Sequence, residues 1–466
     1  MGAVVVTPVT DLLDDLRVMG EPAGLDRELT AVAQGYAEPM RVGLVGRVSS
    51  GKSTLVNAIV GRRVAATAAE DCTRLTTIYR YGTPEAVDCV LVDGSRHPLP
   101  LAVGERDPVI AALPDPEHLE VTLSTARLKG TTLIDTPGLQ GTLGEATASM
   151  SEALTGFDVL LYLFRGSLRA DDDQVAAEFS AATGGRPARH VVGLLSHADN
   201  FGAGAWDETD PIDAARISAA DLHQRHPGRF AAMLAISTLL GESARTGRFT
   251  EDRTLQLRRL ADVSPDLLRF AGLVPPPGVP TEVMTDLLAV AAPYGVAHGR
   301  RHAETPARLS AWAESRSGFT DLEIHLEQVA RPLVLASRLE RVAETVSALV
   351  PRFPPAERRH AATVIERHVS GPRFHLIREL QAHRDLVRDA PGHPLRRDLE
   401  QLLGAPRLPE RREWLGKISG GRPDRAAALA QAGRYAAMGP LARLGAEAQA
   451  IRTLSASMVN LAGDLG

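Results

Sequence analysis

The sequence has 466 residues, 44% of them hydrophobic and 23% charged, with a formal net charge of −5. This length excludes a single small binding module and allows roughly two to four domains, and the composition excludes a disordered chain. The two cysteines, Cys72 and Cys89, are too few for a disulfide scaffold or a four-ligand zinc site. They suit a reducing compartment, so we expect a cytoplasmic protein.

Charge is distributed unevenly along the chain. Residues from Arg331 to the end include 22 basic and 14 acidic side chains, a balance of +8, whereas residues 1–330 carry −13. No segment approaches the roughly 18 apolar residues of a spanning helix, and the N-terminus lacks a signal-peptide pattern. We therefore expect any membrane contact to be peripheral, at the inner face of the cell membrane.

The N-terminal segment from Asp11 to Tyr36 predicts a helix, because apolar residues recur on one face between Leu25 and Tyr36. That face needs a partner. We expect residues 1–39 to pack on a helical bundle formed by the C-terminal part of the chain.

Short apolar runs alternate with helical stretches through residues 40–245, which is typical of an open α/β sheet. We predict a mixed, mostly parallel sheet, with residues 81–84 joining an antiparallel hairpin. The predicted strands are Arg41–Val45, Leu75–Tyr81, Ala86–Val92, Thr131–Ile134, Val159–Phe164, His190–Leu195 and Met233–Ile236.

Residues 246–466 carry no convincing strand pattern and predict an all-α bundle. A short heptad seam supports this prediction, since an apolar stripe at such spacing must pack on another helix. The seam residues are Leu335, Leu339, Val342, Val346 and Leu349.

The strongest local signal is a glycine-rich run, Gly46 to Thr54, between a predicted strand and a predicted helix. In that context backbone N–H groups wrap phosphates, Lys52 reaches the β- and γ-oxygens, and the Ser53 hydroxyl binds Mg²⁺. The run therefore predicts an α/β P-loop domain. Its nucleotide-binding residues are Gly46, Ser50, Gly51, Lys52, Ser53 and Thr54.

A second motif, Asp135 to Gly138, ends a predicted strand. Asp135 would hold Mg²⁺ through a water molecule, and the Gly138 N–H would sense the γ-phosphate. No acidic residue follows Asp135 to act as a base, so the pattern favours a switch-type GTPase over an ATPase.

The loop of residues 65–75 lies between these motifs. A threonine in this loop can bring its hydroxyl to Mg²⁺ and its N–H to the γ-phosphate. Thr67, Thr73, Thr76 and Thr77 are candidates. We favour Thr73, because Thr76 and Thr77 belong to a predicted strand; a plain loop threonine is the alternative.

The base-reading residues follow two further predicted strands. Ser196-His197-Ala198-Asp199 stands where guanine-specific GTPases carry Asn or Thr, Lys, any residue and Asp. Asp199 can accept hydrogen bonds from guanine N1 and N2, which adenine cannot supply. His197 replaces the usual lysine, so specificity is expected to rest mainly on Asp199, and Ser237-Thr238 would contact guanine O6.

The run GRVSSGKSTLVNAIVGRRVAATAAEDCTRLTTIYRYG, with DTPGL, LLSHADN and SRSGFTDL, is similar to bacterial dynamin-like GTPases of the actinobacterial isoniazid-inducible type. The resemblance extends over nearly the whole chain, and its GTPase motifs are the specific part. It implies a large GTPase with a helical neck and trunk. Such a protein dimerises through its GTPase domains, as a homodimer or with a dynamin-like paralogue, and remodels membranes.

The resemblance also gives roles to P-loop residues. By matching position, Ser49 is the serine that orients the catalytic water or a monovalent cation. Val48 stands where many dynamins carry a glutamine, and Leu139 leaves no water-orienting glutamine after the Asp135 motif. Arg47 at the loop tip could stabilise transition-state charge in cis or across a dimer, or be a solvated arginine.

We therefore predict a Mg²⁺-dependent enzyme that hydrolyses GTP to GDP and phosphate at an anionic membrane surface. One alternative is a regulatory GTPase of ribosome or RNA, which the 4% aromatic content disfavours, so we expect no nucleic-acid partner. The other is a nucleotide-gated scaffold, partner to an active paralogue. For the membrane contact we predict the stretch from Leu403 to Pro423, including Arg411, Arg412 and Trp414; its alternative is a solvated trunk loop with Trp414 packed on its own helices.

Overall fold

The computed structural model describes residues 7–19, 25–47, 49–66, 75–137, 156–168, 191–202, 204–205, 209–226, 229–371, 374–390, 392–403, 405 and 408–465. Its contacts divide the chain into two compact units. Unit 2 is Pro39–Glu323, and unit 1 combines Met1–Glu38 with Ile324–Gly466. The chain returns to unit 1 within α13 (Phe319–His325).

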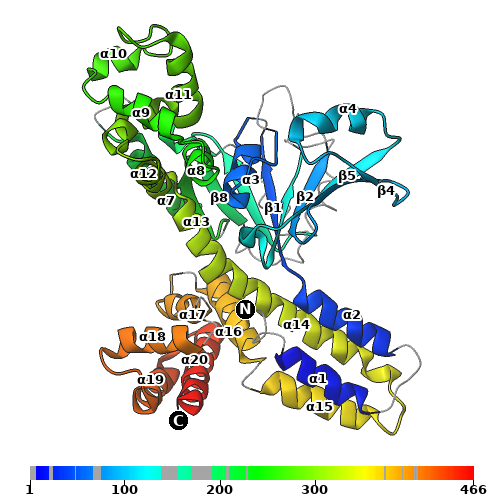
Figure 1. Ribbon diagram of the computed structural model, residues 1–466. Coiled ribbons are helices and arrows are strands. Elements are labelled where there is room, and N and C mark those ends of the chain that lie inside the picture. Colours follow the sequence, from blue (N-terminus) through cyan, green and yellow to red (C-terminus); the bar gives the residue numbers. More distant parts are fainter. Residues whose placement is uncertain are drawn as a thin grey trace. The chain divides into compact units, whose positions relative to one another are not determined.

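Unit 2 is built on one sheet of nine described strands in the order β4-β3-β5-β2-β6-β1-β7-β8-β9 (Figure 1). Five neighbouring strands, β6, β1, β7, β8 and β9, run parallel, which confirms the predicted mixed, mostly parallel sheet. The central strands β7 and β8 are buried along their whole length, as expected for strands covered on both faces. The strands are β1 (Met40–Gly46), β2 (Thr76–Tyr81), β3 (Ala86–Leu91), β4 (Arg96–Pro98), β5 (Pro116–Leu123), β6 (Thr131–Asp135), β7 (Val159–Phe164), β8 (Val191–Ser196) and β9 (Ala232–Ile236).

The predicted hairpin across residues 81–84 is wrong. β5 lies between β2 and β3, parallel to β2 and antiparallel to β3. In β5 the buried residues Leu119, Val121 and Leu123 alternate with less buried ones, which is the pattern of a half-buried strand. The physical reason for the error is that this strand, unrecognised in the sequence, takes the place beside β2 that β3 was expected to occupy.

The helices of unit 2 extend well beyond residue 245. Phe249, Met284 and Leu309 share one apolar core with Leu160 and Val191 of the sheet. The compact units therefore do not divide after residue 245. The predicted domain bounds, 1–39, 40–245 and 246–466, stay a prediction. The helices are α3 (Lys52–Val60), α4 (Arg106–Ala111), α7 (Pro211–Arg225), α8 (Thr238–Arg245), α9 (Glu251–Arg259), α10 (Pro265–Arg269), α11 (Thr281–Tyr294) and α12 (Pro306–Ser317).

Unit 1 is helical in all its described elements. The N-terminal segment forms two helices, α1 (Thr7–Arg17) and α2 (Leu25–Ala37), where one was predicted. Both share an apolar core with α14 (Arg331–Leu349) and α15 (Arg358–Ser370). Four of the five heptad residues are buried in that core, and Leu335 is half-buried.

A second core in unit 1 is formed by its remaining helices, α16 (His375–Asp389), α17 (Leu395–Leu403), α18 (Leu408–Ser419), α19 (Arg425–Met438) and α20 (Gly445–Asp464). None of the described helices combines the length and apolar character that a bilayer crossing requires.

The predicted membrane stretch belongs to this core, and the prediction is wrong for two of its three named residues. Trp414 is only 6% exposed, and its Nε1 donates to Gln401 Oε1 at 2.7 Å. Arg411 donates two hydrogen bonds to the buried Glu379 carboxylate, at 2.9 and 2.7 Å. Only Arg412 is exposed. The helical fold turns Arg411, Trp414 and Leu415 inward, where they stabilise the bundle, whereas Lys417 stays exposed like Arg412.

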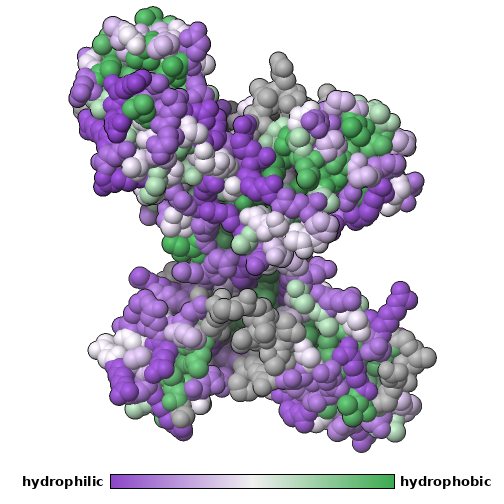
Figure 2. All heavy atoms as spheres, viewed as in Figure 1, coloured by the Kyte–Doolittle hydropathy of each residue, from purple (hydrophilic) through white to green (hydrophobic). Residues whose placement is uncertain are grey.

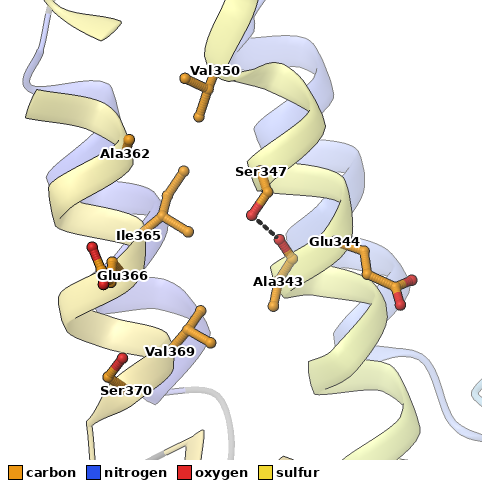
Figure 3. A pocket seen from close by; sticks show the side chains of 9 residues that line it. All are labelled: Ala343, Glu344, Ser347, Val350, Ala362, Ile365, Glu366, Val369 and Ser370. Atoms are coloured by element: carbon orange, nitrogen blue, oxygen red, sulfur yellow. Dashed lines mark hydrogen bonds between the residues drawn. The ribbon is translucent and has the colours of Figure 1, made fainter. Parts of the chain in front are cut away.

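An open groove of about 620 Å³ lies between α14 and α15 on the surface of unit 1 (Figure 3). Val350, Ile365 and Val369 line it together with small residues and two glutamates, Glu344 and Glu366. The Ser347 hydroxyl donates to Ala343 O at 2.7 Å, so its proton is used within its own helix. The groove is therefore apolar with two carboxylates at its walls, a lining that would repel charged phosphates.

Candidate nucleotide-binding site

The carboxyl ends of four parallel strands bring the predicted motifs to one edge of the sheet in unit 2. β1 ends at Gly46, β6 at Asp135 and β8 at Ser196, and Ser237 follows the last residue of β9. Ligands of open α/β sheets bind outside the carboxyl ends of the strands. The predicted phosphate-binding, metal-binding and base-reading motifs therefore share the edge at which such ligands bind.

The glycine-rich run forms the turn between β1 and α3. Gly51 has a φ of 95° and caps the helix N-terminus, and Ser49 has a φ of 60°. A Cβ on Gly51 would lie 2.8 Å from Thr238 Oγ1, so glycine is required here for both its conformation and its close approach to α8. The turn thus presents the N-terminus of α3, a favourable position for an anion.

Lys52 is buried beneath this turn. Its Nζ donates to Gly46 O at 2.9 Å and to Arg47 O at 3.2 Å, so the ammonium lies against the loop carbonyls. Ser53 and Thr54, in the first turn of α3, are half-buried, as is Arg47. A cation held in this position can neutralise phosphate charge.

Asp135 is 1% exposed at the end of β6. Burial raises its pKa to about 7, and the nearby Lys52 opposes that rise. Among the described residues its Oδ1 has no hydrogen-bond partner, and the same holds for Ser50 Oγ. The next residue, Thr136, holds the strand end in place by donating its hydroxyl to Leu44 O at 2.7 Å.

These oxygen atoms fit a hard divalent cation. Mg²⁺ prefers carboxylate, hydroxyl, water and phosphate oxygens, and Asp135 and Ser53 supply the first two. The third predicted ligand, Thr73, lies outside the described residues. Gly138, Val48 and Leu139 also lie outside them.

The base-reading motif follows β8. The Ser196 hydroxyl donates to Phe164 O at 3.0 Å, so its proton is used within the sheet. His197 adopts a left-handed conformation with a φ of 56°, and its Nε2 lies 3.3 Å from Ser49 O of the P-loop. Burial, helped by Arg165, lowers the pKa of His197. Asp199 is buried in the short helix that follows.

Ser237 lies at the start of α8. It is completely buried, and its backbone N–H donates to Ser317 O at 2.9 Å. Its hydroxyl has no hydrogen-bond partner among the described residues. Because the backbone donor is already used, a contact from Ser237 to guanine O6 would have to come from that hydroxyl.

Sequence reasoning missed Asn57, which lies on the buried side of α3. Its Oδ1 accepts from the backbone N–H groups of Val64 and Ala65 at 2.8 and 2.9 Å, and its Nδ2 donates to Glu242 Oε1 of α8 at 2.8 Å. Asn57 therefore ties the segment that leads into residues 67–74 to the helix that starts at Thr238. Its only sequence signal is that it is an amide side chain within the apolar part of α3, residues 55–60.

The fold and this edge define a P-loop nucleotide-binding α/β domain in a chain that also has a helical unit. Residues 42–181 match the model of the dynamin family. The isoniazid-induced protein IniC of Mycobacterium tuberculosis, from two strains, is 32% identical over 248 residues. The match spans about half of each protein, 50% of this chain and 49% of IniC. The predicted resemblance to dynamin-like proteins of the isoniazid-inducible type is thus confirmed.

Two solved structures show a weaker similarity to this chain, with TM-scores below 0.5. A chain of an oligomerised bacterial dynamin pair, described for the long-range sensing and tethering of membranes, is 12% identical, with a TM-score of 0.39, over 99% of this chain and 74% of that chain. Era of Aquifex aeolicus bound to GDP·AlF4⁻ is 17% identical, with a TM-score of 0.24, over 42% of this chain and 50% of that one.

Proposed function

We propose that this chain is a dynamin-like GTPase that hydrolyses GTP to GDP and phosphate with Mg²⁺ and couples the reaction to a membrane surface. One observation carries the nucleotide part of the proposal. Three buried oxygen atoms, those of Ser50, Asp135 and Ser237, have no hydrogen-bond partner among the described residues and belong to the three predicted motifs. Buried polar atoms are normally paired, so these atoms suit a polar ligand.

In this proposal each motif has one task. The N-terminus of α3 and Lys52 hold the phosphates, while Ser53, Thr73 and, through water, Asp135 hold Mg²⁺. When bound, Mg²⁺ would neutralise charge that develops on the phosphate oxygens. Ser49 and Arg47 would act nearest the attacking water.

Guanine selection is proposed to rest on Asp199, which is buried and carries the acceptor pair that guanine N1 and N2 require. The test is Asp199→Asn, which should weaken GTP and favour xanthosine triphosphate, whose O2 accepts from the new amide. Asp252→Asn, an exposed change on α9, is the matched control. Equal binding of ATP and GTP by the wild type would show that Asp199 is misassigned.

A nucleotide-gated scaffold is the second candidate. It is favoured by Val48 and Leu139, two positions at which water-orienting glutamines are absent from the sequence. A single-turnover GTP assay with and without liposomes separates the two. An enzyme converts bound GTP within the assay, whereas a scaffold retains it.

The membrane part of the proposal is supported by the +8 balance after Arg331, which suits an anionic surface. We propose peripheral attachment at the inner face of the cell membrane and assembly as a homodimer or with a paralogue. The corrected assignment of Arg411 and Trp414 removes the predicted contact from this proposal and leaves the charge of the C-terminal part as its support.

A further inference from the structure

An apolar turn projects from unit 2 where α10 leads into α11. Leu267, Phe270, Leu273 and Val274 are 49%, 59%, 86% and 68% exposed. Large apolar side chains exposed singly are common, but four within residues 267–274 form a patch. We call these four residues the apolar turn.

The apolar turn is anchored by the residues between its members. Leu268 and Ala271 are 2% and 3% exposed and belong to the core of unit 2. The segment therefore already has the inward-facing residues that it needs for folding. Figure 2 shows hydrophobic side chains gathered on the surface of the α9 to α11 region. The exposed members contribute little to the core, so their exposure calls for another explanation.

Several backbone donors of this segment are paired within it. The N–H groups of Leu273 and Val274 both donate to Phe270 O at 2.8 Å, and that of Ala271 donates to Leu268 O at 3.1 Å. The following prolines, at positions 275, 276, 277 and 280, have no N–H. Unpaired backbone donors and acceptors both disfavour a loop in an apolar phase. This turn carries few unpaired donors, and at the hydrated boundary of a bilayer its carbonyl groups can still accept hydrogen bonds from water.

The size and charge of the patch favour lipid over protein. A stable protein interface buries about 800 Å² and roughly 20–30 residues on each side, far more than four side chains. Insertion into a bilayer is favourable even for a few apolar side chains, because the free energy gained scales with the apolar area removed from water. The nearby exposed charges nearly cancel, because Arg258, Arg259 and Arg269 accompany Asp262 and Asp266. Attraction between charges therefore contributes little at this place.

We propose that the apolar turn inserts into the boundary between headgroups and acyl chains of a lipid bilayer, as a contact separate from the basic C-terminal part. This inference rests on the proposed coupling to membranes and assigns one site for it. Since the insertion is apolar, it requires neither anionic lipid nor low salt.

The test is flotation of the full chain with neutral phosphatidylcholine vesicles. The double variant Leu273→Glu with Val274→Glu should bind at least about tenfold more weakly than the wild type. Ile217→Glu is the matched control, because Ile217 is a lone exposed residue of α7 at 71% exposure. Both variants should bind GTP as the wild type does, which shows that they fold. Wild-type binding should persist at high salt.

A second measurement reports insertion directly. Phe270→Trp should add tryptophan fluorescence that brominated lipids quench. The tryptophan added by Ile217→Trp should fluoresce equally with and without brominated lipids. Because each variant is compared with the wild type, the native tryptophans cancel.

Three results would overturn the inference while leaving the proposed function standing. They are unchanged binding of the double variant, wild-type binding that requires anionic lipid and is lost in salt, and a protein dimer that the double variant abolishes. If the wild type hydrolyses GTP but floats with neither neutral nor anionic vesicles, the membrane part of the proposed function fails together with this inference.

Discussion

At the scale of single residues, the account depends on polar groups that the fold buries at the edge of the sheet. Lys52 and Asp135 are both at least nine-tenths buried, which is costly for charged groups unless a partner or ligand compensates. Lys52 is compensated by loop carbonyls, and one oxygen of Asp135 lacks a protein partner among the described residues. A ligand that brings phosphate and a cation would complement both.

Lys52→Ala should weaken binding of GTP by about a hundredfold, because hydrogen bonds between an ammonium and phosphate oxygens are charge-assisted. Titration with a fluorescent GTP analogue measures the change. Lys129→Ala, outside the site, is the control and should bind normally. Undiminished affinity in the Lys52 variant would contradict the P-loop assignment.

The pH dependence of stability should depend in part on His375. Burial lowers its pKa, aided by Arg378 and Arg411 and opposed by Glu379 and by a backbone hydrogen bond to Thr453. The unfolded chain takes up a proton near pH 6.5, whereas the folded chain does so at lower pH. This contribution to stability is therefore present above about pH 6.5 and is lost as the pH falls below it.

The variant His375→Gln should lose part of that dependence. Thermal unfolding of the full chain at neutral and mildly acidic pH measures the difference, with the exposed His360→Gln as control. If the two variants lose stability equally on acidification, His375 is not the group responsible.

Residue-scale prediction from the sequence succeeded where spacing alone encodes a local structure. The run Gly46 to Thr54 specifies a strand, a turn and a helix by its own order. Asn57 was missed because its partners, Val64, Ala65 and Glu242, are brought to it by folding. For Trp414, the alternative that it packs on its own helices is the one that the structure shows.

At the scale of elements, α18 illustrates how one arginine of a basic stretch becomes internal. Glu379 of α16 is fully buried and accepts hydrogen bonds from Arg411 and from Ser457 at 2.7 Å. Glu379, Arg411 and Ser457 therefore join three helices, α16, α18 and α20. Removing Arg411 leaves the charge of Glu379 buried and unpaired.

Arg411→Ala should lower the free energy of unfolding by about 3 kcal/mol. The neighbouring Arg412→Ala, which removes an exposed arginine from the same helix, should change it by less than about 0.5 kcal/mol. Denaturant unfolding of both variants provides the comparison. Equal stabilities would mean that the buried pair does not stabilise unit 1.

Strand order could not be obtained from local patterns. The existence and type of β1, β6, β7, β8 and β9 followed from their apolar runs, but the position of β5 depends on pairing with β2 and β3, which are distant in sequence. The apolar spacing of the N-terminal segment predicts one continuous helix. It does not indicate that α1 ends at Arg17 and that α2 begins at Leu25.

At the scale of the whole molecule, unit 1 takes its helices from both ends of the sequence and unit 2 from the middle. The apolar face between Leu25 and Tyr36 lies in one core with α14 and α15. Apolar periodicity could not indicate that residues 246–323 belong with the sheet, because that depends on the shared core of Phe249 and Met284 with Leu160.

Hydrolysis should rise with protein concentration, because the positions of Val48 and Leu139 supply no glutamine to orient water and a second copy could complete the site. The test is the turnover rate per molecule, measured while the protein concentration is varied about a hundredfold. A flat profile with no dimer in a transition-state analogue complex would indicate chemistry in cis.

The most direct test of the central claim is single-turnover hydrolysis of GTP and of ATP by the purified full chain with Mg²⁺, beside Lys52→Ala. We predict conversion of GTP to GDP and phosphate, little conversion of ATP, and loss of GTP conversion when Mg²⁺ is chelated or Lys52 is replaced. Equal conversion of the two nucleotides, or GTP conversion that survives the Lys52 substitution, would contradict the account.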